Sequence, residues 1–149
     1  MLHHSFLEYG EFRGPIGGRA SGVQVASDSG QVTGFALQNL QDRGEFFVEP
    51  GEQVYEGEVV GEHCKDNDIA VNVAKAKHLT NMRNANKENL DTLKAKRSFT
   101  LEEALEYIEE DELVEATPKS IRLRKRILQE KMRLKDERER ASKEKEAVA

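Results

Sequence analysis

The sequence predicts an α+β domain: a small antiparallel β-sheet or partial barrel with a long basic loop, one acidic helix, a β-hairpin and a charged C-terminal helix. Three observations lead to this prediction. Short apolar runs alternate with glycine-containing turns over residues 22–73, which is typical of closely spaced strands. A capping signal opens an apolar helical face near residue 100. Apolar and basic residues alternate over residues 120–124, as they do in a half-buried strand.

The first strands follow from the alternation of Val23 and Val25 with polar neighbours. The turn signal at residues 28–30 and the apolar run at 32–37 predict that this strand continues into a hairpin, although residues 37–41 also fit one helical turn. Further strand pieces are predicted at 46–48, 54–55, 59–60 and 69–73. Cys64, which follows one of these pieces, is expected to be a partly buried strand residue.

The acidic helix begins at Thr100, whose hydroxyl can accept from the backbone three residues on while Glu103 reaches back. The helix is expected to end near Glu110. Its buried face is predicted from the helical period, and the residues assigned to that face are Leu101, Ala104, Leu105 and Ile108.

Two strands, 113–116 and 121–123, are predicted around a turn at 117–120. The alternation puts Ile121 and Leu123 inward and leaves Arg122 and Arg124 facing outward. Arg122 has two readings, a contact with a phosphate or a structural pair with Glu115 across the hairpin. From residue 127 to 149 the chain is predicted to be a charged helical tail with a frayed end.

Charge is distributed in blocks. The net charge is −5, which by itself argues against nucleic acid, but residues 75–97 carry seven bases and two acids. Residues 101–115 carry eight acids and no base, and residues 119–133 carry seven bases and one acid. Two basic blocks in a chain of 149 residues favour a polyanionic partner over a set of merely solvated faces.

The sequence lacks the residues that several classes of function require. The single cysteine excludes an internal disulfide and fits a reducing compartment. There is no phosphate-binding loop, no cysteine and histidine spacing for zinc and no identifiable active site. No apolar run approaches the length of a membrane span. The sequence thus predicts a cytoplasmic protein without catalytic residues, metal or membrane contact of its own.

Specific runs of residues carry a resemblance to a known family. These runs are GRASGV at 18–23, LQDRG at 40–44, VYEG at 54–57, LTNMR at 79–83, TLE at 100–102, ALE at 104–106, DELVE at 111–115, TPKSIR at 117–122 and RKR at 124–126. In this respect the chain resembles the C-terminal region of the TypA/BipA family of ribosome-associated translational GTPases.

The resemblance implies a domain organisation. Residues 1–17 look like the end of a preceding elongation-factor-G-like domain with its linker. Residues 18–126 correspond to the family's C-terminal domain, and residues 74–98 correspond to its long loop, which is basic here. The nucleotide-binding domain, with GTP and Mg²⁺, would lie upstream, so this fragment is expected not to hydrolyse GTP or to hold a cofactor.

The resemblance also implies partners. The family's domain helps to hold the protein on the ribosome, and its loop reaches toward A-site tRNA, so large-subunit rRNA and A-site tRNA are the expected partners of a monomeric chain. The implied activity of the parent is translation under stress or large-subunit assembly, in the cytoplasm or in an organelle with bacterial-type ribosomes. The alternative is a protein-interaction module that uses the acidic helix and the charged tail.

The expected RNA-binding residues lie in the loop and after the hairpin turn, where cations can reach phosphates and Asn, His or Met can meet sugars and bases. They are Lys75, Lys77, His78, Asn81, Met82, Arg83, Asn84, Lys87, Lys94, Lys96, Arg97, Arg122, Arg124, Lys125 and Arg126. The loop departs from the family pattern where Ala95 and Lys96 replace a proline pair, which makes it more basic and less rigid.

Overall fold

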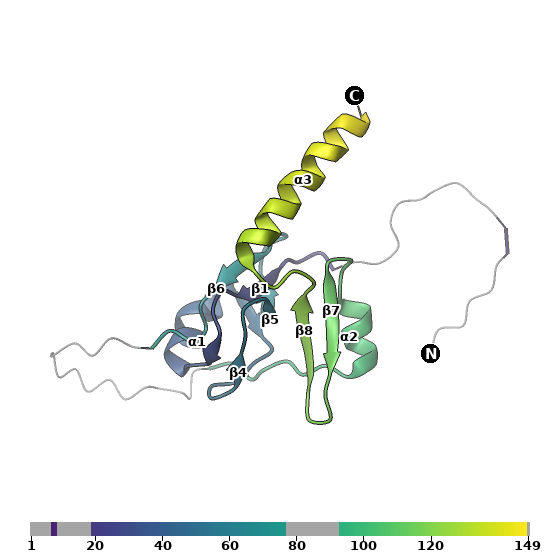
Figure 1. The fold of residues 1–149 in the computed structure, drawn as a ribbon. Coiled ribbons are helices and arrows are strands. Elements are labelled where there is room, and N and C mark those ends of the chain that lie inside the picture. Colours follow the sequence, from purple (N-terminus) through teal and green to yellow (C-terminus); the bar gives the residue numbers. More distant parts are fainter. Residues whose placement is uncertain (1–6, 9–18, 77–92, 149) are drawn as a thin grey trace.

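The computed structural model describes residues 7–8, 19–76 and 93–148. It confirms the α+β class, with helices on a β-sheet and a last helix that projects away from the body (Figure 1). Six strands form one sheet, in the order β6-β1-β5-β8-β7 with β3 paired to β5. Their bounds are β1 Val23–Ala26, β3 Gly44–Phe46, β5 Glu58–His63, β6 Ile69–Val71, β7 Glu112–Ala116 and β8 Ile121–Lys125.

The sheet differs from the predicted antiparallel one because β1 pairs with β6 in parallel. Its other pairs are antiparallel, and β7 and β8 form the hairpin that the sequence predicts, with Glu115 opposite Arg122. The order of the described strands leaves β6 and β7 at the two ends, so the sheet is open and does not close into a barrel.

The hairpin predicted for residues 23–37 is wrong. The short strand β2 (Gly30–Gln31) leaves β1 and pairs with β4 (Gln53–Val54). Residues after it form helix α1 (Gly34–Leu40), because the Thr33 hydroxyl accepts from the Ala36 amide and caps the helix, which buries Ala36 and Leu37. A 3-10 turn, η1 (Gln41–Arg43), then leads into β3.

Two apolar clusters lie on opposite faces of the sheet. Neighbouring residues of β5 show this, since Val60 packs with Leu37 of α1 whereas Val59 packs with Ala104 of α2 (Leu101–Tyr107). Successive strand residues point to opposite faces, so one helix covers each face. The two clusters together hold most of the buried apolar side chains among the described residues.

Helix α2 has the predicted capping box, with Thr100 accepting from the Glu103 amide. The predicted buried face is only partly right. Ala104 is buried and Ile108 packs on the same cluster, but Leu101 and Leu105 remain 47% and 56% exposed. Tyr107 takes their place because it meets Phe47 and Phe99, and the helix ends there, before residue 110.

Two segments flank this body. Residues 93–98, predicted to belong to a long loop, lie against the sheet, where the Arg97 amide donates to the Phe46 carbonyl at 2.9 Å and Leu93 packs on a core cluster. Helix α3 (Glu130–Val148) confirms the charged C-terminal helix. Cys64 follows β5 and is exposed, contrary to the expectation that it would be partly buried.

Candidate nucleic-acid interface

The basic run of β8 is divided between the two faces of its strand. Leu123 and Lys125 are buried on the side of α2, whereas Arg122 and Arg124 alternate onto the other face and are half-buried. Arg126 follows the strand and is exposed. The cations that the sequence places side by side therefore occupy three different environments.

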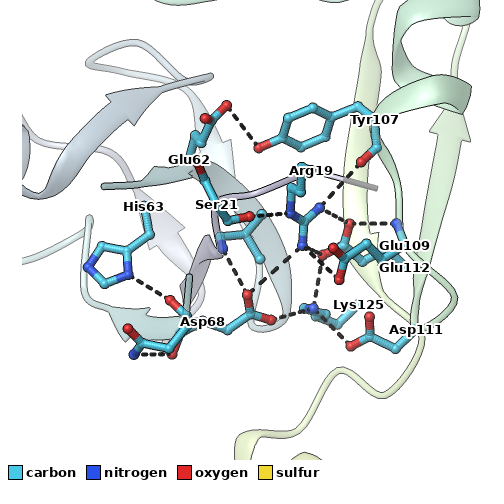
Figure 2. A network of polar contacts seen from close by, with 12 residues as sticks. Arg19, Ser21, Glu62, His63, Asp68, Tyr107, Glu109, Asp111, Glu112 and Lys125 are labelled. Atoms are coloured by element: carbon cyan, nitrogen blue, oxygen red, sulfur yellow. Dashed lines mark hydrogen bonds and ion pairs between the residues drawn. The ribbon is translucent and has the colours of Figure 1, made fainter. Parts of the chain in front are cut away.

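Lys125 belongs to a buried charge cluster, shown in Figure 2. Its ammonium lies 2.5 Å from Asp68, 2.8 Å from Asp111 and 2.9 Å from Glu112, and its side chain is 3% exposed. Arg19 enters from the N-terminal side and binds both oxygens of Glu112, at 2.5 and 2.6 Å. We use the name buried charge cluster for the buried side chains of Arg19, Glu112 and Lys125 together with the partly exposed carboxylates that contact them, Asp68, Glu109 and Asp111.

Both cations of the cluster are compensated by its carboxylates. Burial alone would lower the pKa of Lys125, but hydrogen bonds to Asp111, Asp68 and Glu112 outweigh it and raise that pKa. Burial alone would raise the pKa of Glu112, but Arg19 and Lys125 outweigh it and lower that pKa. Both groups are held in their charged forms by each other.

The expectation that Lys125 contacts RNA conflicts with this arrangement. An ammonium that is surrounded by three carboxylates and shielded from solvent is unable to reach a phosphate. Its role is to tie β8 to β7 and to the turn that carries Asp68. Without Lys125, the expected RNA-binding cations in and just after β8 are Arg122, Arg124 and Arg126.

Arg122 does not form the ion pair with Glu115 that was the structural alternative for it. Its Nε lies 3.9 Å from Glu58, and Glu115 instead accepts from the Tyr55 hydroxyl at 2.6 Å. Burial raises the pKa of Glu58 to about 7, helped by Glu115 and Glu52 and opposed by the Tyr55 amide and Arg122. A carboxyl group that is partly protonated near neutral pH compensates the Arg122 charge only in part.

The end of the loop supplies Lys94, Lys96 and Arg97. Lys94 is exposed. Lys96 contacts Glu52 at 2.6 Å and Glu49 at 3.4 Å, so its charge is largely neutralised, and these carboxylates raise its pKa. Arg97 lies 3.1 Å from Glu62, and its guanidinium covers the Phe99 ring at 4.9 Å.

The rest of the loop can be located only in part. Lys75 is exposed just after β6, beside α1. The remaining expected contacts, namely Lys77, His78, Asn81, Met82, Arg83, Asn84 and Lys87, lie outside the described residues.

Sequence reasoning did not include Lys119 among the site residues. The residue is exposed in the turn of the β7–β8 hairpin and lines a cavity that Arg97 and Arg122 also line. Its place in the TPKS turn was visible in the sequence, since a turn residue between two strands projects at the tip of a hairpin. Arg19 was also missed as a structural residue, and no local pattern predicts its partner 93 residues away.

Other kinds of site find no support in the part of the chain that the structure describes. No group of three or more His, Cys, Asp or Glu side chains there has the arrangement of a metal site. Among the same residues, no helix combines the length and apolar character that crossing a bilayer requires.

Comparison with known proteins identifies relatives. The model of the TypA/BipA C-terminal domain matches residues 21–130. The chain is 50% identical over 149 residues to the large ribosomal subunit assembly factor BipA of Bacillus subtilis, covering 99% of this chain and 24% of that protein. It is 50% identical over 125 residues to the protein of the same name from Synechocystis, covering 84% and 21%.

A third relative, the large ribosomal subunit assembly factor BipA of Escherichia coli O157:H7, is 45% identical over 131 residues, covering 87% of this chain and 22% of the relative. The chain thus spans about a quarter of the length of these proteins or slightly less. The family model covers most of the chain, including the whole described sheet. The chain therefore belongs to the TypA/BipA C-terminal domain family.

Proposed function

We propose that this chain is the ribosome-binding part of a TypA/BipA-type translational GTPase, and that it contacts large-subunit rRNA and A-site tRNA. The observation that carries the proposal is the family membership, together with relatives named large ribosomal subunit assembly factor. The chain would act as the anchor of a protein that works in large-subunit assembly or in translation under stress. The parent would bind GTP and Mg²⁺ in a separate domain, and this chain would contribute no catalytic group.

The described cations support a contact with RNA. Arg124 and Arg126 on the hairpin side, and Lys75 and Lys94 at the two ends of the loop, form no ion pair with another described residue. Cations without internal partners can neutralise phosphates and release the counterions that surround them. The seven expected contacts between residues 77 and 87 would extend this set. Such a partner places the protein in the cytoplasm, or in an organelle with bacterial-type ribosomes.

The test is the salt dependence of binding to purified large ribosomal subunits and to tRNA. If about six phosphates are engaged, affinity should fall on the order of 10³-fold between about 50 and about 200 mM salt. A variant with Lys75, Lys77 and Arg83 replaced by Gln should have a shallower salt dependence. A matched variant with Lys65, Lys131 and Lys143 replaced by Gln loses the same charge at other positions and should keep the original slope. Equal slopes for the two variants would exclude the loop as the contact.

A second candidate function, a contact with a protein partner, has one observation in its favour. Leu101 and Leu105 lie one turn apart on α2, are both about half exposed, and stand among the acidic side chains of Glu102, Glu103 and Glu106. An exposed leucine pair with acidic surroundings suits a basic amphipathic partner. Binding by this route would be lost in a Leu101→Ser, Leu105→Ser variant that retains RNA binding.

A further inference from the structure

A cleft of about 760 Å³ lies between residues 96–99 and the turn of the β7–β8 hairpin. We call it the hairpin cleft. Phe47 and Phe99 contribute apolar surface, and Lys96, Arg97, Lys119 and Arg122 contribute cations. Glu52 and Glu58 also line it. Its volume lies within the range of about 300–1,000 Å³ that is usual for sites that take small organic groups.

One side of the cleft carries a flat cationic surface. The Arg97 guanidinium lies 4.9 Å from the centre of the Phe99 ring and 5.5 Å from that of Tyr107, and Glu62 holds one nitrogen at 3.1 Å. The Arg97 amide also donates to the Phe46 carbonyl at 2.9 Å. One face of the guanidinium is therefore fixed on aromatic rings, while the side chain remains 43% exposed. A planar group held in this way is a platform on which a nucleobase can stack without prior ordering.

The β7–β8 hairpin contributes two further cations to the cleft, Lys119 in its turn and Arg122 in β8. The Thr117 hydroxyl accepts from the Ser120 amide at 3.0 Å and donates to the Ser120 carbonyl at 2.8 Å, which closes the turn that carries Lys119. Lys119 forms no ion pair with another described residue. Arg122 has only the distant carboxyl group of Glu58, at 3.9 Å.

The cations of the cleft are unevenly paired with carboxyl groups. The carboxylates of Glu49 and Glu52 satisfy Lys96, and Glu62 satisfies Arg97. Glu58 lies 3.9 Å from Arg122, and because its pKa is raised to about 7 it compensates that charge only in part near neutral pH. The positive charge that internal carboxylates compensate least therefore lies at Lys119 and Arg122, which line the same cleft as Arg97.

We propose that the hairpin cleft binds one unpaired nucleotide of RNA, with its base on the free face of Arg97 and its phosphate between Lys119 and Arg122. The proposal rests on the RNA-binding function proposed above and names the form of RNA that this part of the surface takes. A base inside a duplex is stacked and paired, so only an unpaired one can enter a cleft of this size. An acidic peptide would satisfy Lys119 and Arg122 but would leave the Arg97 platform unused.

The experiment compares a fluorescently labelled single strand of about eight nucleotides with a duplex of the same sequence, each titrated with the whole chain. Arg97→Lys keeps the charge and removes the plane, and it should weaken single-strand binding on the order of 10-fold while leaving duplex binding unchanged. Lys119→Gln should weaken single-strand binding, whereas Lys65→Gln, an exposed cation away from the cleft, should not. Thermal melting establishes that each variant is folded.

A second readout locates the base directly. A single strand with 4-thiouridine at a central position should crosslink to residues 96–99 or 117–122, and polyglutamate should not compete at equal charge. Crosslinks confined to other residues, an equal effect of Arg97→Lys on single strand and duplex, or displacement by polyglutamate would overturn the cleft assignment. If RNA still binds in that case, the proposed function survives without the cleft; if the unaltered chain binds no RNA, both proposals are wrong.

Discussion

The buried charge cluster and the hairpin cleft both take cations from β8, yet they hold them in opposite ways. Lys125 has carboxylate oxygens from three residues within 2.9 Å and is 3% exposed. Arg122, three positions earlier, has one carboxyl group at 3.9 Å and is 34% exposed. Strand parity and the identity of the facing element decide this difference, because both residues are equally basic. The comparison teaches that a basic run in a strand can alternate between buried, fully paired cations and partly exposed cations with few internal partners.

The largest expected effect comes from opening the buried charge cluster. Glu112→Ala leaves Arg19 and Lys125 buried without their shared carboxylate, and it should lower the free energy of unfolding by about 3–5 kcal/mol. Urea unfolding measures this loss. Glu110→Ala removes an exposed acid next to the cluster and should change stability by less than about 0.5 kcal/mol. Similar losses in both variants would show that the cluster is not structural.

A smaller effect of opposite sign is expected at the edge of the cleft. The pKa of Glu58 is raised from its usual value of 4.5 to about 7, so the folded chain holds a proton there that the unfolded chain has lost. Stability should therefore be greatest below pH 4.5 with respect to this group, and should decrease as the pH rises through about 7. Glu58→Gln should remove this dependence and raise the free energy of unfolding at pH 8 by about 2 kcal/mol.

The groups that face Glu58 are Tyr55, Glu52, Arg122 and Glu115, and none of them is altered in that variant. Glu45→Gln, on the exposed side of β3, serves as the control. Urea unfolding at several pH values should give the two variants different pH profiles. A Glu58→Gln profile that parallels the unaltered chain would show that Glu58 titrates normally.

A third prediction distinguishes the partly exposed cations in and just after β8 from the buried Lys125. Replacing Arg124 and Arg126 by Gln should reduce the slope of log affinity against log salt by roughly 1.4 for single-stranded RNA, at about 0.7 per phosphate contact. Lys125→Gln should destabilise the fold but leave the slope unchanged where the protein remains folded. A reduced slope for Lys125→Gln would mean that the buried cluster opens on binding.

The smallest effect is expected at α2, the helix that neighbours both the buried charge cluster and the hairpin cleft. Thr100→Ala removes the cap of α2, directly after Phe99 of the cleft, and should cost about 1 kcal/mol in urea unfolding. Thr100→Ser keeps the hydroxyl and should restore most of the loss. Thr100→Ala that unfolds like the unaltered chain would show that packing alone holds the helix.

Local signals in the sequence predicted some elements well. The capping box placed the start of α2 at its observed position, and the alternation over residues 120–124 predicted β8 and its outward arginines. The prediction that residues 32–37 return along β1 was wrong because it used β-period apolar residues where Thr33 caps a helix. The turn signal at 28–30 was real, but the chain after it pairs with β4.

What the sequence could not supply was the pairing of distant segments. The role of Lys125 depends on Asp68, which the parallel pairing of β6 with β1 brings to the hairpin. Leu101 and Leu105 satisfied the helical period as well as Ala104 did, and only the position of the Phe47 and Phe99 rings turns Tyr107 inward instead. The family resemblance predicted which residues contact RNA, and the contacts show which of the described ones have internal partners.

The bidentate interaction of Arg19 with Glu112 has a mechanical consequence. Arg19 also donates to the Ser21 carbonyl, so the backbone that enters the domain is clamped to β7, which lies far away in sequence. Tension or torque that arrives along the chain ahead of Arg19 would load this clamp before it stretched the backbone of β1. Rotation of the backbone at Arg19 would then turn the β7–β8 hairpin with it, and would move Arg122 and Arg124, which lie in β8.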